Sequence, residues 1–457
     1  MKEGKKVSTH RKGVAVATVA VGAAMVLAFS ACSSPSSGGG TPSSSGPVAI
    51  SFWHSTTGPG ATTIQQLVDQ FNSDNAGKIV VTASYQGSYA QAQTKYTAAV
   101  QSKSTPSVMA MNDISTGFMI DSKQTVPVYQ LAANDSSFST SDIPAASVAY
   151  YSDDKGLLAM PFAVSQPMLY INPTMAQAAG LDPTNPPTTF DQFAQWAQQI
   201  KDKTGNYGMT MNMGDSWILE ELTASGGELF CTPENGRGSG QVTDINVTSP
   251  TQIGFMTTLQ KLFQDGAALN AGTATADEIA AFTAGKVGLV LTSSASYTAL
   301  KSGEGSSVVV APFPEASSSP DGGAAIGGAA LWIDGPGHST AEQQASYEFA
   351  KFMDSAESQA AWSASTGYLS SNTGSASLPA GQTALADPNV QVMYNEFNNN
   401  PASQASSGCR MGPYAAVRAT VIAAFDQITT GTDPTTAMQQ AEVTAKSQIA
   451  QYNSELG

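Results

Sequence analysis

Two segments of the chain combine residue types that could attack or hold a small molecule. In the first, Gly214-Asp215-Ser216-Trp217 places a serine next to an aspartate, and His338 could act as the base in ester hydrolysis. The spacing does not suit that chemistry, however. The chain also lacks a Gly-x-Ser-x-Gly motif, a His-Glu-x-x-His motif, a Cys-x-x-Cys motif and a glycine-rich loop that could hold phosphate. We therefore expect no catalysis, and a secreted esterase using Ser216 is a distant alternative.

The second segment contains two of the three arginines that follow residue 31, Arg410 and Arg418. A guanidinium beside a helix start can bind phosphate or carboxylate through two parallel hydrogen bonds. A structural salt bridge explains such an arginine equally well. Ser165, Ser293 and Gly328 each stand at the end of an apolar segment, where hydroxyl and backbone N–H groups could complete an anion site. Ordinary capping explains each of these three residues too.

Metal and carboxylate-pair chemistry have little support in the sequence. His54 and His338 are the two histidines beyond residue 31 and lie far apart, so we expect no metal site and no cofactor. Asp153-Asp154 and Glu220-Glu221 are carboxylate pairs. Acids in turns and on helix surfaces explain these pairs better than a glycosidase dyad does.

An alternation of strand and helix patterns must position these residues. Strands are predicted over 48–53, 78–82, 107–111 and 287–291, and helices over 89–100, 341–353 and 434–452. Three capping boxes predict further helix starts, at Thr189 with Gln192, Ser249 with Gln252, and Thr275 with Glu278. The alternation predicts an α/β protein with largely parallel sheets, in which side chains at the carboxyl ends of strands face the ligand crevice.

Size and charge limit the possible functions. Roughly 410 residues follow the N-terminal segments, which suggests about two domains. Removal of residues 1–31 would take five basic residues and one acidic residue from a formal charge of −15, which leaves −19. Such an acidic chain is not expected to bind nucleic acid, or an anionic membrane through charge alone. Cys231 and Cys409 could pair in an oxidising compartment, but nothing local in the sequence requires it.

The N-terminal residues have the pattern of a bacterial lipoprotein signal. Basic residues precede an apolar run at 14–29 that is too short for a comfortable membrane span, and Cys32 follows a small residue. We expect a signal peptide over 1–31, a lipid on Cys32, and a flexible Ser/Gly/Pro linker over 32–47. Phe29 stands where leucine is usual, so a plain signal peptide is the alternative. Both versions predict an extracytoplasmic protein, and the first predicts one anchored to the cell membrane.

A series of short motifs, taken in order, resembles the extracellular solute-binding proteins of ABC importers, and within them the glycerol-3-phosphate-binding subfamily. The motifs are Phe52-Trp53-His54-Ser55, Tyr85-Gln86-Gly87-Ser88-Tyr89, Tyr150-Tyr151-Ser152-Asp153, Pro161-Phe162, Gly180-Leu181-Asp182-Pro183, Pro186-Pro187, Ile326-Gly327-Gly328-Ala329, Thr366-Gly367-Tyr368-Leu369, and Arg410 with Arg418. The resemblance implies two α/β lobes that close by a hinge around one ligand and then dock on a membrane permease. The implied lobes are 48–163 with 313–353, and 164–312 with 354–457.

The resemblance also implies a set of ligand-binding residues. Carried over position by position, they are Tyr89, Asp113, Ser165, Trp217, Ser293, Gly328, Tyr368 and Arg418. In this reading Arg418 supplies a positive charge to phosphate oxygens, Asp113 accepts hydrogen bonds from glycerol hydroxyls, and Trp217 forms a flat apolar wall.

Two positions depart from the pattern of the subfamily. Asp113 replaces a glutamate, and Gly214 replaces a tryptophan whose loss should open space beside the ligand. That space suggests room for a substituent such as the choline of glycerophosphocholine, whose ammonium group aromatic faces would attract. We therefore expect a monomeric receptor that captures glycerol-3-phosphate and/or glycerophosphodiesters for import. The closest alternative is a receptor for maltodextrin-like oligosaccharides, and Arg418 is the residue that separates the two.

Overall fold

The computed structural model describes residues 46–303, 307–316 and 322–456, and these described residues form one compact unit. The predicted signal peptide, the predicted lipidation site at Cys32 and most of the predicted linker lie outside the described residues. Among the residues described, no helix is long and apolar enough to cross a membrane.

The first sheet has the strand order β2-β1-β3-β13-β6. Its strands are β1 (Val48–His54), β2 (Ile79–Tyr85), β3 (Val108–Asn112), β6 (Met160–Ser165) and β13 (Gly327–Ile333). The parallel strands β1, β2 and β3 confirm the strands predicted at 48–53, 78–82 and 107–111, and β13 runs antiparallel between β3 and β6. The buried side chains of alternating apolar residues on β1 explain why it lies inside the sheet.

The second sheet has the order β12-β7-β11-β8. Its strands are β7 (Pro167–Ile171), β8 (Tyr207–Met211), β11 (Val287–Ser293) and β12 (Val309–Pro312). Only Gln166 separates β6 of the first sheet from β7 of the second. Gln166 is fully buried; its carbonyl accepts a hydrogen bond from the Ser294 N–H, and its side-chain amide donates to the Met393 carbonyl.

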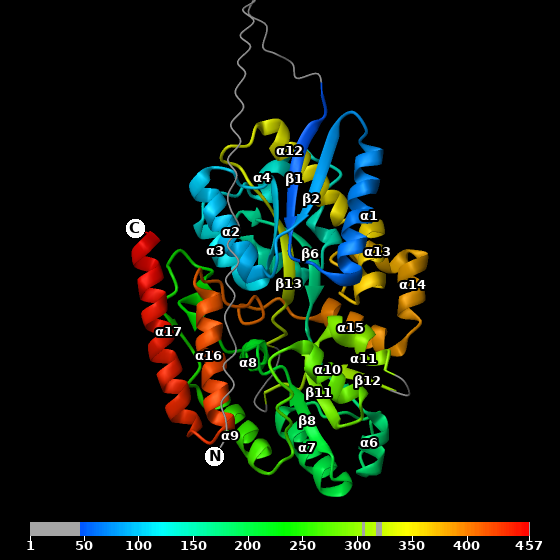
Figure 1. Ribbon diagram of the computed structural model, residues 1–457, viewed down its shortest axis with the longest axis vertical. Helices are drawn as coiled ribbons and strands as arrows, with labels where there is room; N and C mark the ends of the chain where they lie inside the picture. Colours follow the sequence, from blue (N-terminus) through cyan, green and yellow to red (C-terminus); the bar gives the residue numbers. More distant parts are fainter. Residues whose placement is uncertain (1–45, 304–306, 317–321, 457) are drawn as a thin grey trace, which may run out of the picture. The chain divides into compact units, whose positions relative to one another are not determined.

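Helices cover both sheets, as Figure 1 shows, with α16 and α17 side by side. The longer helices are α1 (Gly58–Asp74), α2 (Tyr89–Ser102), α7 (Phe190–Thr204), α8 (Trp217–Ser225), α9 (Pro250–Gln264), α10 (Thr275–Thr283), α12 (Thr340–Met353), α13 (Ala356–Thr366), α15 (Pro388–Asn399), α16 (Tyr414–Thr429) and α17 (Pro434–Leu456). The shorter ones are α3 (Thr116–Asp121), α4 (Val128–Leu131), α5 (Ala145–Tyr151), α6 (Pro173–Ala178), α11 (Tyr297–Lys301) and α14 (Pro379–Leu385). The α/β class is therefore confirmed. Helix α13 packs on α1, and the predicted lobe boundaries stay a prediction.

The helix starts show where the capping predictions hold. Thr189 and Ser249 are the N-caps of α7 and α9 and accept hydrogen bonds from the backbone N–H of the third helical residue, Gln192 and Gln252. The other half of each predicted capping box is wrong, because Gln192 Oε1 accepts from the Thr188 N–H and the Gln252 amide donates elsewhere. The capping box predicted at Thr275 is wrong, because α10 has Ala274 as its N-cap and no side-chain cap. Glu278 is instead buried against β11, where it accepts a hydrogen bond from the Thr292 hydroxyl.

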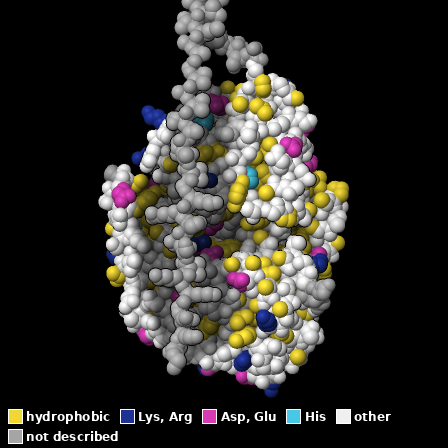
Figure 2. Space-filling view, in the orientation of Figure 1, with side chains coloured by type: hydrophobic (Ala, Val, Ile, Leu, Met, Phe, Trp, Pro, Cys, Tyr) yellow, Lys and Arg dark blue, Asp and Glu magenta, His cyan; other side chains and the backbone are white. Residues whose placement is uncertain are grey.

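The surface carries few charges, in keeping with a chain in which charged residues make up 12%. In Figure 2, Lys, Arg, Asp and Glu side chains are few and widely spaced on the visible described surface, and some of them lie in pairs of opposite charge. Uncharged polar side chains must therefore provide most of the groups that hydrate this surface.

Candidate functional site

The ends of three strands of the first sheet bring three of the predicted residues together. Asp113 directly follows β3, and the Gly328 N–H on β13 donates to its Oδ1 at 3.3 Å. Gly327 pairs with Ser165, so Ser165 lies at the neighbouring end of β6. Gly328 has φ +121°, and a Cβ there would lie 1.8 Å from the Ala163 carbonyl oxygen, so the close approach of these backbones requires glycine.

Aromatic residues from three other segments lie near these strand ends. Trp217 begins α8; its indole N–H donates to the Ala325 carbonyl at 3.3 Å, and its ring lies directly beside Gly327. Tyr368 is placed by the next residue, Leu369, whose N–H bonds the Val164 carbonyl. Tyr89 is the first residue of α2. Burial raises the pKa of its hydroxyl, and the nearby Tyr368 and Asp113 raise that pKa further.

Ser293 ends β11 and lies across from Pro167 in the second sheet. Its hydroxyl accepts a hydrogen bond from the Ala295 N–H at 3.2 Å, so the capping explanation left open by the sequence is observed. The following turn touches the Tyr368 segment, since a Cβ on Gly367 would lie 3.1 Å from the Ala295 carbonyl. Ser293 is thus adjacent to the site, and its hydroxyl, which accepts this bond, retains a proton that it can donate.

Arg418 is held by carboxylates. Its Nε and Nη2 donate to the two oxygens of Glu220 at 2.7 and 2.6 Å, a bidentate pair. Its Nη1 lies 3.3 Å from Asp215 Oδ1, and its Nη2 lies 3.7 Å from Asp113 Oδ2. The salt bridge that the sequence left as an alternative therefore exists in this structure. Tyr414 adds a ring face 5.2 Å from the guanidinium carbon.

Glu220 and Glu221 were assigned to a helix surface, and this assignment is wrong. Their exposed fractions are 6% and 1%. Glu220 is buried because it pairs with Arg418. Glu221 is buried because it accepts a hydrogen bond from the Ala325 N–H at 2.7 Å, just before β13. A rare buried arginine needs a carboxylate partner, and that requirement is the signal that could have pointed to Glu220.

The charged groups around Arg418 change the pKa of the Asp113 carboxyl. Burial raises the pKa of the Asp113 carboxyl to about 6, and the carboxylates of Glu220 and Asp215 act in the same direction. The Arg418 guanidinium opposes the rise without cancelling it. One guanidinium thus faces three carboxylates, and the pKa of the Asp113 carboxyl is raised toward neutrality.

This shift predicts how stability depends on pH. The unfolded carboxyl loses its proton near pH 3.8 and the folded one near pH 6. Between these values the folded state binds more protons, so the free energy of unfolding should fall as pH rises through the window and stay lower above it. The shift corresponds to about 3 kcal/mol. Chemical denaturation at intervals between about pH 4 and pH 7 should show a flatter profile for Asp113→Asn than for the wild type, and equal slopes would contradict the assignment.

Among the residues described, the serine and histidine that the esterase alternative requires do not lie together. The Ser216 hydroxyl is buried and donates to Glu220 Oε1 at 3.3 Å. His338 lies elsewhere, with its Nε2 3.1 Å from the Thr105 hydroxyl and its Nδ1 3.7 Å from Glu342. Ser216 therefore belongs to the carboxylate cluster around Arg418.

The space expected beside Gly214 is filled at the point where a side chain would leave its Cα atom. A Cβ on Gly214 would lie 2.2 Å from the Thr273 carbonyl oxygen. The prediction that the lost indole leaves room at this point is wrong, because the backbone around Thr273 fills it. A narrow cavity does exist beside Trp217, and Asp113, Tyr150 and Tyr414 also line it.

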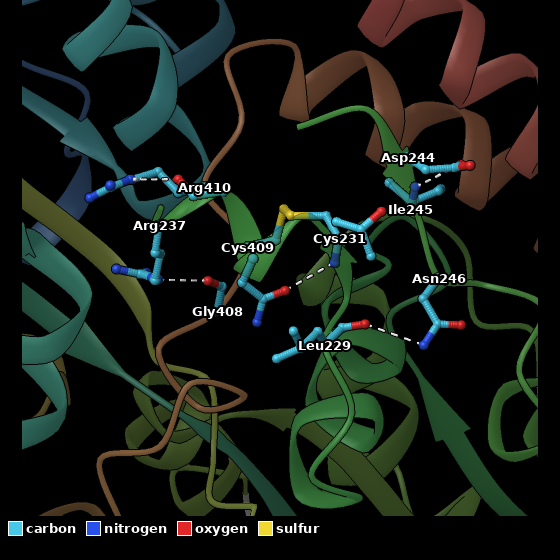
Figure 3. Close-up of a disulfide and its surroundings, with 12 residues drawn as sticks. Leu229, Cys231, Arg237, Asp244, Ile245, Asn246, Gly408, Cys409 and Arg410 are labelled. Carbon is cyan, nitrogen blue, oxygen red and sulfur yellow. Dashed lines mark hydrogen bonds between the residues drawn. A yellow bond between two sulfur atoms is a disulfide. The ribbon is translucent and has the colours of Figure 1, made fainter. Parts of the chain in front are cut away.

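A disulfide that the sequence left open adjoins that cavity, which Cys409 helps to line. Cys231 and Cys409 are bonded, with their Cα atoms 5.7 Å apart. Figure 3 shows Arg237 reaching the Gly408 carbonyl beside it, at 2.9 Å. The guanidinium of Arg237 also donates to the carbonyls of Ala149 and Tyr150. Covalent and polar links therefore fix the segment before Arg418 against α5 and β9 (Cys231–Thr232).

Comparison with known proteins agrees with the resemblance. The family model described as "Bacterial extracellular solute-binding protein" matches residues 66–391. The sn-glycerol-3-phosphate-binding periplasmic protein UgpB of Pectobacterium atrosepticum is 28% identical over 390 residues, 84% of this chain and 86% of that protein. UgpB of Escherichia coli K12 is 29% identical over 392 residues, 84% of this chain and 88% of that protein.

Solved structures share the fold. UgpB from Mycobacterium tuberculosis in complex with glycerophosphocholine superposes with a TM-score of 0.70 at 20% identity, covering 89% of this chain and 99% of that one. The cyclic α-maltosyl-1,6-maltose binding protein from Arthrobacter globiformis gives a TM-score of 0.71 at 20% identity, covering 88% and 99%. These likenesses confirm the two-lobed binding-protein fold. The matched family consists of substrate-binding proteins of the extracellular or periplasmic space. The chain belongs to this family of bacterial extracellular solute-binding proteins and serves an ABC transporter, where such proteins deliver a small molecule to a membrane permease.

Proposed function

We propose that this protein captures a glycerophosphodiester with a cationic head group, or glycerol-3-phosphate, and passes it to its permease. The observation that carries the proposal is the cluster of Asp113, Gly328 and Arg418 at the edge of the first sheet, with Trp217 beside it. The relatives named for glycerol-3-phosphate and the neighbour bound to glycerophosphocholine support this ligand class.

The charge of the cluster favours the diester over the monoester. Glu220 already occupies two donor sites of Arg418, and Asp113 and Asp215 add two further carboxylates. A phosphate monoester brings a charge of about −1.5 to −2 near pH 7, which these carboxylates repel. A choline diester brings one negative and one positive charge, and its ammonium group is attracted to carboxylates and aromatic faces. The ammonium would lie between Asp113 and the rings of Tyr89 and Trp217.

One observation favours a second candidate, a neutral oligosaccharide. Because the bidentate pair with Glu220 neutralises Arg418, the site does not require an anion. Carboxylates such as Asp113 and Asp215 can accept hydrogen bonds from sugar hydroxyls, and Trp217 can pack against a sugar ring. A protein named for binding a maltosyl sugar shares this fold.

Calorimetric titration of the purified protein decides between these ligands. Glycerophosphocholine, glycerol-3-phosphate and maltose are titrated side by side under one set of conditions. We expect micromolar or tighter binding of glycerophosphocholine, weaker binding of glycerol-3-phosphate and no binding of maltose. Binding of maltose alone would overturn the proposal. Tight binding of glycerol-3-phosphate with weak binding of the diester would overturn the argument from charge.

We further propose that the protein works as a monomer anchored through a lipid on Cys32. The basic segment, the apolar run and the Ser/Gly/Pro tract around that cysteine support the anchor. Cell fractionation tests it, because a Cys32→Ser variant should leave the membrane fraction.

A further inference from the structure

A second cavity, of about 470 Å³, lies beside Tyr368. Its volume falls in the range of small-molecule sites, about 300–1,000 Å³. Side chains from α11, α13, α14 and α15 surround it, and its wall is mainly apolar; Ala364, Leu385, Val390 and Met393 are among its residues. An apolar cavity of this size favours an aliphatic or aromatic group.

The cavity adjoins the proposed ligand site at two segments of the chain. Tyr368 lines the cavity, and its neighbour Leu369, also in the wall, is bonded to the Val164 carbonyl beside Ser165. On the other side, the wall residue Gly367 lies against the turn that follows Ser293. Two of the residues expected to bind the ligand head, Ser293 and Tyr368, therefore lie on or next to segments that wall the cavity.

The charged groups of the cavity satisfy each other. Lys301 and Asp387 form an ion pair at 2.5 Å, and the Tyr297 hydroxyl donates to the same Asp387 oxygen. Asp387 also accepts a hydrogen bond from the Asn389 N–H. Because these charges are paired with each other, a bound molecule needs no charged group in this cavity. Burial of a hydrocarbon group against the remaining apolar wall would stabilise binding.

We propose that this cavity binds the acyl chain of a glycerophosphodiester that carries one fatty acid, while the head group binds near Asp113, Gly328 and Arg418. This inference rests on the proposed function and extends the substrate class to monoacyl glycerophosphodiesters. Each methylene buried in such a cavity strengthens binding by about fourfold when it is fully removed from water. Partial burial of an eight-carbon chain should therefore give at least a tenfold gain.

The test compares glycerophosphocholine with its 1-octanoyl ester by calorimetric titration of the full chain, below the concentration at which the ester forms micelles. The wild type should bind the ester at least tenfold more tightly. Ala364→Phe, which places a ring on the cavity wall, should remove this gain and leave the affinity for glycerophosphocholine unchanged. Ala361→Phe is the matched control, since this residue is exposed on the same helix outside the wall and should keep the gain.

The outcomes distinguish failure of the acyl-chain proposal from failure of the proposed function. Equal or weaker binding of the ester by the wild type, with glycerophosphocholine bound as expected, would overturn only the acyl-chain proposal. Loss of the gain in both phenylalanine variants, or binding of the ester that glycerophosphocholine does not displace, would also overturn it, because the chain would then bind elsewhere. Absence of binding by either compound would overturn both proposals.

Discussion

An Arg418→Ala variant should unfold with a free energy about 3–5 kcal/mol below that of the wild type. The side chains of Arg418 and Glu220 are 12% and 7% exposed, so the substitution leaves a carboxylate buried without its partner. Asp113 and Asp215 lose the same cation, and their mutual repulsion adds to the cost. Chemical denaturation at pH 7 measures the loss.

Two control variants show whether the loss comes from the uncompensated carboxylates. Arg418→Met combined with Glu220→Gln removes both members of the bidentate pair and should recover much of the stability. Lys261→Ala breaks an exposed pair with Asp265, in which the lysine side chain is 72% exposed, and should cost at most about 1 kcal/mol. If Arg418→Ala costs as little as Lys261→Ala, the cluster is not the buried network described above.

Removal of the disulfide should have the second largest effect. A Cys231→Ser, Cys409→Ser double variant is expected to lose about 2–5 kcal/mol of stability. The bond joins residues 178 positions apart, so its loss frees a long loop in the unfolded chain. It also releases the segment before Arg418, which then depends on the hydrogen bonds from Arg237 to the Ser407 and Gly408 carbonyls.

The reduced wild type is the internal comparison for this variant. Unfolding of the wild type in the presence of a thiol reductant should match unfolding of the double variant with or without reductant. Wild-type unfolding that does not change on complete reduction of the bond would contradict the prediction. A glycerophosphocholine titration of the folded double variant then tells whether the bond also shapes the site, because Cys409 lines the cavity that contains Asp113.

Local patterns in the sequence predicted some of the elements that position the site, namely α2, β3 and β11, but not β6, β13 and α8. The β-like runs at 48–53 and 107–111 form adjacent strands because their apolar residues pack on helices from the same stretch of chain. The helix predicted at 434–452 is present and continues to Leu456, because its small apolar residues pack against α16. These elements depend on interactions between residues close in sequence, which a single chain reveals.

The charge cluster depends on contacts that no local pattern contains. Glu220 and Arg418 are far apart in sequence, and the local pattern around Glu220 predicts only an exposed acid on a helix. Glu278 matched a capping box, but the β11 strand offered its carboxyl the Thr292 hydroxyl inside the fold. The sequence predicts lost volume at Gly214, although the backbone of Thr273 fills that side of it. In each case a partner from a distant segment decided the outcome.

Gln166 has a mechanical consequence for the way a ligand could be sensed. The chain passes from the last strand of one sheet to the first strand of the other with this single buried residue between them, and hydrogen bonds fix it to Ser294 and Met393. A joint this short has few free torsions, so a rotation of one sheet relative to the other would turn about the backbone of Gln166 and its two neighbours. We therefore expect a ligand that contacts both sheets to produce a small, reproducible displacement between them, of the kind that a membrane partner can recognise.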